Sequence, residues 1–388
     1  MKTDVVIIGG GIVGCATAYY LSGKGHRVVV IEKDAGAGLQ ASGRNAGGVR
    51  QQGRQAALPL AMEAIRLWAG LAQELESELE YQRTGNLILA LDGKGAANLE
   101  EEVEWEQEQG LLDVRMISAA ECHEIVPGLT DRVVAGKHCA SDGAANPMLV
   151  TPAFSRAAQR QGAIIRYGTT ALELLMQGST ISGVKTDAGE IEAGFVVNAA
   201  GPWAQRFNAM AGCSTPISPG RSQLLITEKM PPRLSPFLTV MEKAYLRQAP
   251  AGNVIIWIAG LPNEALEQYV DFASVRQHAA NMLEVFSWLR DVNLIRTFAG
   301  ITEYTPDGEP YIGAVPGVAN FFVAVGFHGQ GFCVGPMAGK ILAELIDGGE
   351  SPVSLVPFQP DRFSNNEAGS AESADVKYPG SVMEPKRN

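Results

Sequence analysis

The chain has 388 residues, of which 46% are hydrophobic and 19% are charged, and its formal net charge is −11. This length and composition exclude wholesale disorder and predict two or three domains with a large buried core. The acidic balance and the absence of a Lys/Arg cluster exclude nucleic acid as an expected partner.

The five cysteines are scattered and include no CxxC pair. This pattern fits neither a metal site nor a disulfide framework, so we expect no metal and a reducing, cytoplasmic compartment. The apolar segment at residues 5–13 is too short and too rich in glycine to cross a membrane, so no transmembrane segment is expected.

The first predicted unit, residues 3–33, is a strand, a glycine turn, a helix and a second strand. Gly9, Gly11 and Gly14 have the spacing of a dinucleotide-binding turn. The first glycine forms the turn, the second lets a pyrophosphate approach, and the third lets the helix pack on the strand. Glu32 ends the second strand, where its carboxylate can accept both ribose hydroxyls and repel a 2′-phosphate.

After residue 33 the sequence predicts further helices and strands. The expected elements are a core helix from Pro59, an acidic helix at 99–109 with a solvated Glu-rich face, a helix at 148–161, strands at 163–167, 171–176, 181–186, 195–198, 222–227, 244–248 and 254–258, a helix near 275–289, a strand at 321–325 and a helix from Pro336 to Ile346. Residues 364–388 are polar and aperiodic and are expected to form a mobile tail.

Three further glycine-rich segments accompany these elements: residues 41–48 (ASGRNAGG), 197–203 (VNAAGPW) and 326–332 (GFHGQGF). Each lets a ligand approach the backbone closely. Three extra contact points suit one long ligand lying across the domain, which favours FAD over NAD.

The order of these motifs resembles that of the FAD-dependent amine and amino-acid oxidoreductases of the D-amino-acid oxidase superfamily, which includes sarcosine oxidase, glycine oxidase and proline dehydrogenase. The resemblance covers roughly residues 3–350 and rests on the first glycine turn, SGRNAGG, VVNAAGPWA, and TPDGEPYIG followed by GFHGQGF. It implies an α/β fold with a Rossmann-like FAD-binding domain of the p-hydroxybenzoate-hydroxylase type and an inserted, mostly antiparallel β substrate domain. The expected division is 1–84, 142–215 and 296–350 for the FAD-binding domain and 85–141 and 216–295 for the substrate domain.

The resemblance also implies where FAD binds. Non-covalent FAD is expected, because Asn45 and Gly300 stand where relatives with covalent flavin carry Cys or His. Amides at the start of the helix from Pro336 are expected to stabilise negative charge on the reduced flavin. The residues expected to contact FAD are Gly9, Gly11, Gly14, Glu32, Lys33, Ser42, Arg44, Asn45, Gly47, Gly48, Ala171, Ala200, Gly201, Trp203, Gly326, Gly329, Gln330, Gly331 and Phe332.

The candidate substrate residues are less specific. Glycine-oxidase-like relatives carry a carboxylate-binding Arg where this chain has Thr302. Arg50 and Arg247 are therefore candidate carboxylate ligands, since a guanidinium pairs bidentately with a carboxylate, and a structural salt bridge is the alternative for each. Tyr245 is a candidate hydrogen-bond donor or an ordinary strand aromatic. His328 is a candidate catalytic residue, able to orient substrate or take a proton, or a structural histidine.

Two absences favour a dehydrogenase over an oxidase: residues 254–260 contain no Lys, and Cys333 replaces a Lys of the sarcosine oxidases. We expect a dehydrogenase that oxidises a secondary amine or imino acid related to proline, hydroxyproline or sarcosine by hydride transfer to flavin N5. It is expected to act as the catalytic β subunit of a complex, with electron-accepting partner subunits that could also attach it to a membrane surface. Two alternatives stay open: a glycine-, sarcosine- or D-amino-acid-type oxidase that forms hydrogen peroxide, and a non-catalytic flavin-binding assembly subunit.

Overall fold

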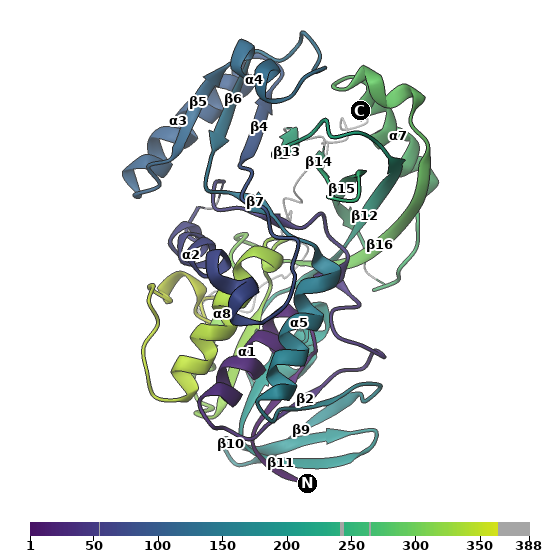
Figure 1. Ribbon diagram of the computed structural model, residues 1–388. Helices are drawn as coiled ribbons and strands as arrows, with labels where there is room; N and C mark the ends of the chain where they lie inside the picture. The colour runs from purple at the N-terminus through teal and green to yellow at the C-terminus, as the bar shows by residue number, and fades with distance from the viewer. Residues whose placement is uncertain (54, 241–243, 264, 364–388) are drawn as a thin grey trace, which may run out of the picture.

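Two large β-sheets organise the protein, and each takes strands from separated parts of the chain (Figure 1). The computed structural model describes residues 1–53, 55–240, 244–263 and 265–363. The expected tail at residues 364–388 lies outside this described part. Within the described residues, no helix combines the length and the hydrophobicity needed to cross a bilayer.

The first sheet is parallel at its centre. Its strands are β1 (Lys2–Ile8), β2 (Val28–Ile31), β8 (Ile164–Arg166), β9 (Ala171–Gln177), β10 (Thr180–Thr186), β11 (Gly189–Asn198), β17 (Tyr311–Ala314) and β18 (Phe321–Val325). They follow the order β17-β18-β11-β1-β2-β8, and β10 and β9 continue from β11. β1 pairs in parallel with β2 and β11, and β18 pairs in parallel with β11. The carboxyl ends of these four strands therefore meet at one edge.

Helices cover one face of this sheet. They are α1 (Ile12–Gly23), α2 (Leu58–Glu74), α5 (Pro147–Arg160) and α8 (Gly331–Ile346), grouped in the lower part of Figure 1. Val5 and Ile7 of β1 pack under these helices, whereas Val6 and Ile8 pack on the opposite face. This alternation follows from the two-residue period of a strand, and it explains why the strand is apolar throughout. Trp68 of α2 is fully buried, as its place in an apolar stripe predicts.

The second sheet is mostly antiparallel. Its strands are β4 (Asn86–Ala90), β5 (Val114–Ser118), β6 (Ala135–Cys139), β12 (Ser218–Lys229), β13 (Phe237–Val240), β14 (Ala244–Gln248), β15 (Asn253–Pro262) and β16 (Leu294–Tyr304). They follow the order β16-β12-β15-β14-β13-β4-β6-β5, and the β13–β4 pair is parallel. The helices α3 (Gly93–Glu108) and α4 (Ala119–Ile125) lie at the β5 end of this sheet, and α7 (Phe272–Leu283) lies at the β16 end (Figure 1).

Shorter elements complete the described chain. The pair β3 (Gly48–Val49) and β7 (Gly143–Ala144) forms a small antiparallel sheet, and α6 (Ala204–Met210) follows β11. The combination of a Rossmann-like parallel sheet and a second, mostly antiparallel sheet confirms the expected fold class.

One segment departs from the expected domain division. β16 pairs with β12 from Leu294 to Tyr304, so residues 296–304 lie in the second sheet instead of with the FAD-binding part. Continuous backbone hydrogen bonding to β12 determines this placement. The other boundaries of the division stay a prediction.

Two helices differ from their expected bounds. α8 begins at Gly331 and not at Pro336, because the left-handed residues His328 and Gly329 reverse the chain just before it. Pro336 lies inside the helix, where its missing N–H removes one backbone hydrogen bond. The other helix, α7, ends at Leu283 and not near residue 289, because Phe286 is extended, with φ −130° and ψ 87°.

Candidate functional site

A cavity of about 420 Å³ lies at the carboxyl edge of the first sheet. Residues that follow β1, β2, β11 and β18 line it, and the second sheet closes it with Trp257 of β15 and with Thr302 and Glu303 of β16. Ligands of open α/β sheets bind at this edge, where the strands end and the helices begin. Residues from each of the four glycine-rich segments noted in the sequence therefore meet at this cavity.

The three glycines of the first turn have different reasons to be glycine. Gly9 has a φ of +107°, and a Cβ there would lie 2.4 Å from the Ala199 carbonyl oxygen. A Cβ on Gly14 would lie 2.0 Å from the Gly9 carbonyl oxygen. Gly11 has an ordinary extended backbone, with φ −73° and ψ −178°, and its Cβ would meet only the Ser42 hydroxyl at 3.1 Å. Glycine is therefore required at positions 9 and 14 by the close packing of the backbone, whereas Gly11 keeps the cavity open beside the α1 N-terminus.

The Glu32 carboxylate is fixed at the cavity wall after β2. One of its oxygens accepts a hydrogen bond from the Gly10 amide at 2.6 Å, and the other accepts one from the Asp34 amide at 2.8 Å. Burial raises the pKa of this carboxyl. Beside it, the Lys33 ammonium lies 3.4 Å from the ring centroid of Trp203, so a cation–π contact joins the ends of β2 and β11.

The loop around η1 (Ala41–Gly43) closes over the start of α1. The Ser42 hydroxyl accepts a hydrogen bond from the Ile12 amide at 3.0 Å. Asn45 donates to the Ala41 carbonyl and accepts from the Gly47 amide, so it holds the loop in its own turn. Arg44 donates to the Ala299 carbonyl at 2.9 Å, which ties the loop to β16. Ser42 and Asn45 line the cavity, and Arg44 fastens the loop from outside it.

The turn between β18 and α8 reaches the cavity from the other side. Gly331, the first residue of α8, lines the cavity, so the positive end of the α8 dipole faces it. This helix start lies five residues before the expected start at Pro336. His328 has a φ of +49°, and its ring meets that of Tyr304 edge-to-face, with centroids 4.9 Å apart.

Of the expected cofactor residues, thirteen line the cavity and six do not, within the described chain. Those that line it are Gly9, Gly11, Glu32, Lys33, Ser42, Asn45, Ala171, Ala200, Gly201, Trp203, Gly329, Gly331 and Phe332. Those outside the lining are Gly14, Arg44, Gly47, Gly48, Gly326 and Gln330. The contacts of all these residues with FAD remain predictions.

An arginine–aromatic layer lies next to the cavity on the side of the second sheet. The Arg50 guanidinium lies 5.0 Å from the ring centroid of Tyr245 and 5.3 Å from that of Phe237. Tyr245 packs on Trp257, with ring centroids 4.9 Å apart, and Trp257 lines the cavity. Arg50 and Tyr245 thus adjoin the cavity without being part of its lining.

Arg247 has a different environment. It is buried, and its Nε donates to the Ala46 carbonyl of the glycine loop. Burial lowers the pKa of this guanidinium to about 10. The contact with the loop backbone favours the structural alternative for Arg247.

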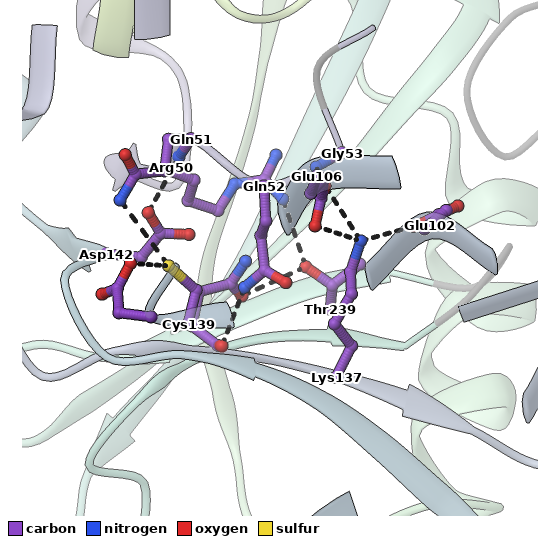
Figure 2. A network of polar contacts seen from close by, with 12 residues as sticks. Arg50, Gln51, Gln52, Gly53, Glu102, Glu106, Lys137, Cys139, Asp142 and Thr239 are labelled. Atoms are coloured by element: carbon purple, nitrogen blue, oxygen red, sulfur yellow. Dashed lines mark hydrogen bonds and ion pairs between the residues drawn. The ribbon is translucent and has the colours of Figure 1, made fainter. Parts of the chain in front are cut away.

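A buried polar network fixes the segment that follows Arg50 (Figure 2). The Gln51 amide donates to Asp142 at 2.8 Å, and the Gly53 amide donates to Glu106. Glu106 in turn pairs with Lys137, whose side chain is fully buried, at 3.1 Å. The expectation that the acidic helix presents a solvated face is therefore wrong at Glu106, because Lys137 of β6 lies beneath it.

Glu303 also lines the cavity, although it is not among the residues expected from sequence. Its Oε1 accepts hydrogen bonds from the Gly326 amide at 2.8 Å and the Phe327 amide at 3.2 Å. Burial raises the pKa of this carboxyl to about 7. An acidic residue in the otherwise uncharged segment 297–306 is the feature of the sequence that could have pointed to it.

The parallel sheet, the glycine turn, the helix N-terminus and the carboxylate after β2 define a dinucleotide-binding oxidoreductase with a second sheet over its site. The family described as "FAD dependent oxidoreductase" (DAO) matches residues 4–345, so the chain belongs to this family. The cofactor is accordingly FAD, and the open space at Gly11 and the fixed Glu32 carboxylate fit it. Non-covalent attachment stays a prediction.

Known proteins similar to this chain cover nearly all of it. The crystal structure of L-proline dehydrogenase from P. horikoshii is 31% identical, with a TM-score of 0.88 over 94% of this chain and 98% of that one. Hydrogen cyanide synthase subunit HcnC of Pseudomonas aeruginosa is 27% identical over 96% of this chain and 99% of its own length. Mitochondrial dimethylglycine dehydrogenase of Rattus norvegicus is 28% identical over 93% of this chain, which spans only 45% of that protein.

Proposed function

We propose that the protein is an FAD-dependent dehydrogenase that oxidises the C–N bond of a secondary amine or imino acid related to proline, hydroxyproline or sarcosine. The arginine–aromatic layer of Arg50, Tyr245 and Trp257 beside the cavity carries this proposal. A guanidinium suits the carboxylate of an imino acid, and aromatic faces suit its methylene groups. The similarity to L-proline dehydrogenase over 94% of this chain supports it.

In this proposal bound FAD supplies the acceptor for a hydride from the carbon next to the nitrogen. Arg50 binds the substrate carboxylate, and the rings of Tyr245 and Trp257 orient the carbon chain. The α8 N-terminus stabilises negative charge at the end of the flavin that it faces. His328 orients the substrate from the turn before α8, and the substrate reacts as its free amine.

We further propose that electrons leave through a partner subunit and not through oxygen. Among the described side chains of β15, Trp257 lines the cavity. Cys333 is buried, and its thiol donates to the Arg50 carbonyl at 3.2 Å. Neither position offers the ammonium that promotes reaction with oxygen in sarcosine-type oxidases. Two relatives, HcnC and the sarcosine oxidase subunit beta of Arthrobacter sp., are by name subunits of larger enzymes.

The choice of electron acceptor is tested by turnover of the purified chain in air with substrate, with and without an artificial dye. A dehydrogenase turns over at least tenfold faster with the dye and forms little hydrogen peroxide. Peroxide formation at the rate of dye turnover would instead establish the oxidase alternative. A chain that binds FAD but stays inert with every acceptor and partner would be the assembly subunit.

Arg50→Ala is expected to raise KM for the amino-acid substrate ten- to hundredfold. The physical reason is the loss of a charge-assisted hydrogen bond, which contributes about 1.5–3 kcal/mol. The measurement is steady-state kinetics with proline and with pyrrolidine, which lacks the carboxylate. Only the KM for proline should change. An equal change for both amines would show that Arg50 has a structural role and does not bind the carboxylate.

A further inference from the structure

Glu303 carries a buried carboxyl oxygen that the fold leaves without a partner. The residue is 9% exposed, and its Oε1 is occupied by the amides of Gly326 and Phe327. Its Oε2 is buried and has no hydrogen-bond partner among the described residues. A Cβ on Gly201 would lie 3.5 Å from this oxygen, so Oε2 lies beside the turn after β11. Glu303 and Gly201 both line the cavity.

An unpaired buried carboxyl oxygen is costly for a fold, and because Glu303 lines the cavity, a bound ligand can supply the missing partner. Above its raised pKa the carboxyl is ionised and can only accept, so in this form its partner must donate a hydrogen bond. FAD offers donors at the adenine amino group, the ribose hydroxyls, the ribityl hydroxyls and flavin N3. Its phosphates only accept hydrogen bonds and are repelled by a carboxylate, so they do not face Glu303.

The strand order excludes the adenine amino group and the ribose hydroxyls. The ribose is expected at Glu32 after β2, and the pyrophosphate at the glycine turn after β1. Glu303 holds the turn after β18 and lies beside the turn after β11, on the opposite side of β1 from β2. With strands about 4.8 Å apart, β18 lies about 14 Å from β2 along this edge. In FAD the ribityl chain follows the pyrophosphate in this direction, before the flavin ring.

We propose that Glu303 Oε2 accepts a hydrogen bond from a hydroxyl of the ribityl chain of bound FAD. The same carboxyl fixes the Gly326–Phe327 turn through Oε1, so one side chain joins the cofactor to the turn that precedes α8. This proposal rests on the FAD site alone and is independent of the substrate.

The test compares FAD with its 2′-, 3′- and 4′-deoxyribityl analogues on the wild-type apoprotein and on the Glu303→Gln variant. Glutamine keeps one carbonyl oxygen for the two amides but replaces the other oxygen with an NH₂ group. Flavin fluorescence titration gives each Kd. We expect Glu303→Gln to raise the Kd for FAD about tenfold. One deoxy analogue should bind the wild type about tenfold more weakly than FAD, and the variant should not discriminate against that analogue.

Glu309→Gln is the matched control. Glu309 is also 9% exposed and accepts a backbone hydrogen bond through Oε1, from the Ala56 amide at 3.1 Å. Its Oε2 has no hydrogen-bond partner among the described residues, but Glu309 does not line the cavity. Its variant should bind all four flavins as the wild type does. Equal weakening of all four flavins in Glu303→Gln would show that the residue acts only on the turn. Wild-type protein that binds the three analogues as tightly as FAD would overturn the proposal even if the variant fails to fold.

Discussion

Gly11→Val is expected to give a folded protein that retains no FAD. The backbone of Gly11 is in a region open to any residue, and a Cβ there meets only the Ser42 hydroxyl at 3.1 Å. The fold therefore tolerates the change. The valine methyl groups, however, fill the space where the pyrophosphate approaches the α1 N-terminus. The measurement is the flavin absorbance of the purified protein, before and after incubation with excess FAD.

The matched control for this prediction is Gly70→Val. Gly70 is exposed on α2, and a Cβ there has open space around it. This variant should purify with the flavin content of the wild type. The thermal unfolding of both apoproteins shows whether they fold alike. Full flavin occupancy in Gly11→Val would contradict the assignment of the pyrophosphate site.

Lys137→Met is expected to lower the free energy of unfolding by about 3–5 kcal/mol, because removal of one partner of a buried ion pair leaves the other uncompensated. Lys137 is fully buried, and Glu106, its partner at 3.1 Å, is 1% exposed. Glu106 also accepts a hydrogen bond from the Gly53 amide, so the change also disturbs the carboxylate that holds the segment after Arg50 (Figure 2). The measurement is urea unfolding at saturating FAD, which keeps the contribution of cofactor binding constant.

The same variant should show a defined pH dependence. Burial already raises the pKa of Glu106, and loss of the Lys137 charge raises it further. Over the range between the unfolded and folded pKa values, the native state holds a proton that the unfolded state has lost. The stability of the variant therefore falls as pH rises through this range, and its deficit should be larger at pH 8 than at pH 5.

Lys185→Met is the control for the buried pair. Lys185 pairs with Glu173 at 3.2 Å, and both side chains are about half exposed. Exposed pairs contribute at most about 1 kcal/mol, so this variant should unfold nearly as the wild type does. A deficit of similar size in both lysine variants, or one without pH dependence in Lys137→Met, would contradict the account of the network.

The fold was predictable where local pattern and tertiary role agree. The Val and Ile run of β1 and the spacing of Gly9, Gly11 and Gly14 predict a parallel strand, a turn and a helix, and all three are present. Helix ends were less predictable. A proline such as Pro336 is compatible with the first turn of a helix, but in α8 it occupies an interior position. The start of α8 is set by the left-handed turn at His328 and Gly329. A left-handed conformation at a non-glycine residue such as His328 is uncommon and is difficult to predict from sequence.

The candidate site was predictable in its glycine loops and not in its buried charges. Lys137 and Glu106 are 31 residues apart, and only the packing of α3 on β6 makes them partners. Glu106 is one of several glutamates in an acidic run, and its burial has no local marker. Glu303 likewise gains its role from two amides that lie 23 and 24 residues further along the chain.

The most direct test of the proposed function is the visible spectrum of the FAD-loaded protein during anaerobic addition of L- and D-proline, hydroxyprolines, sarcosine and glycine. We expect the flavin bands to bleach with at least one secondary amine of this set and to return only slowly when air is admitted. Flavin bands that persist with every member of the set would contradict a dehydrogenase of secondary amines or imino acids.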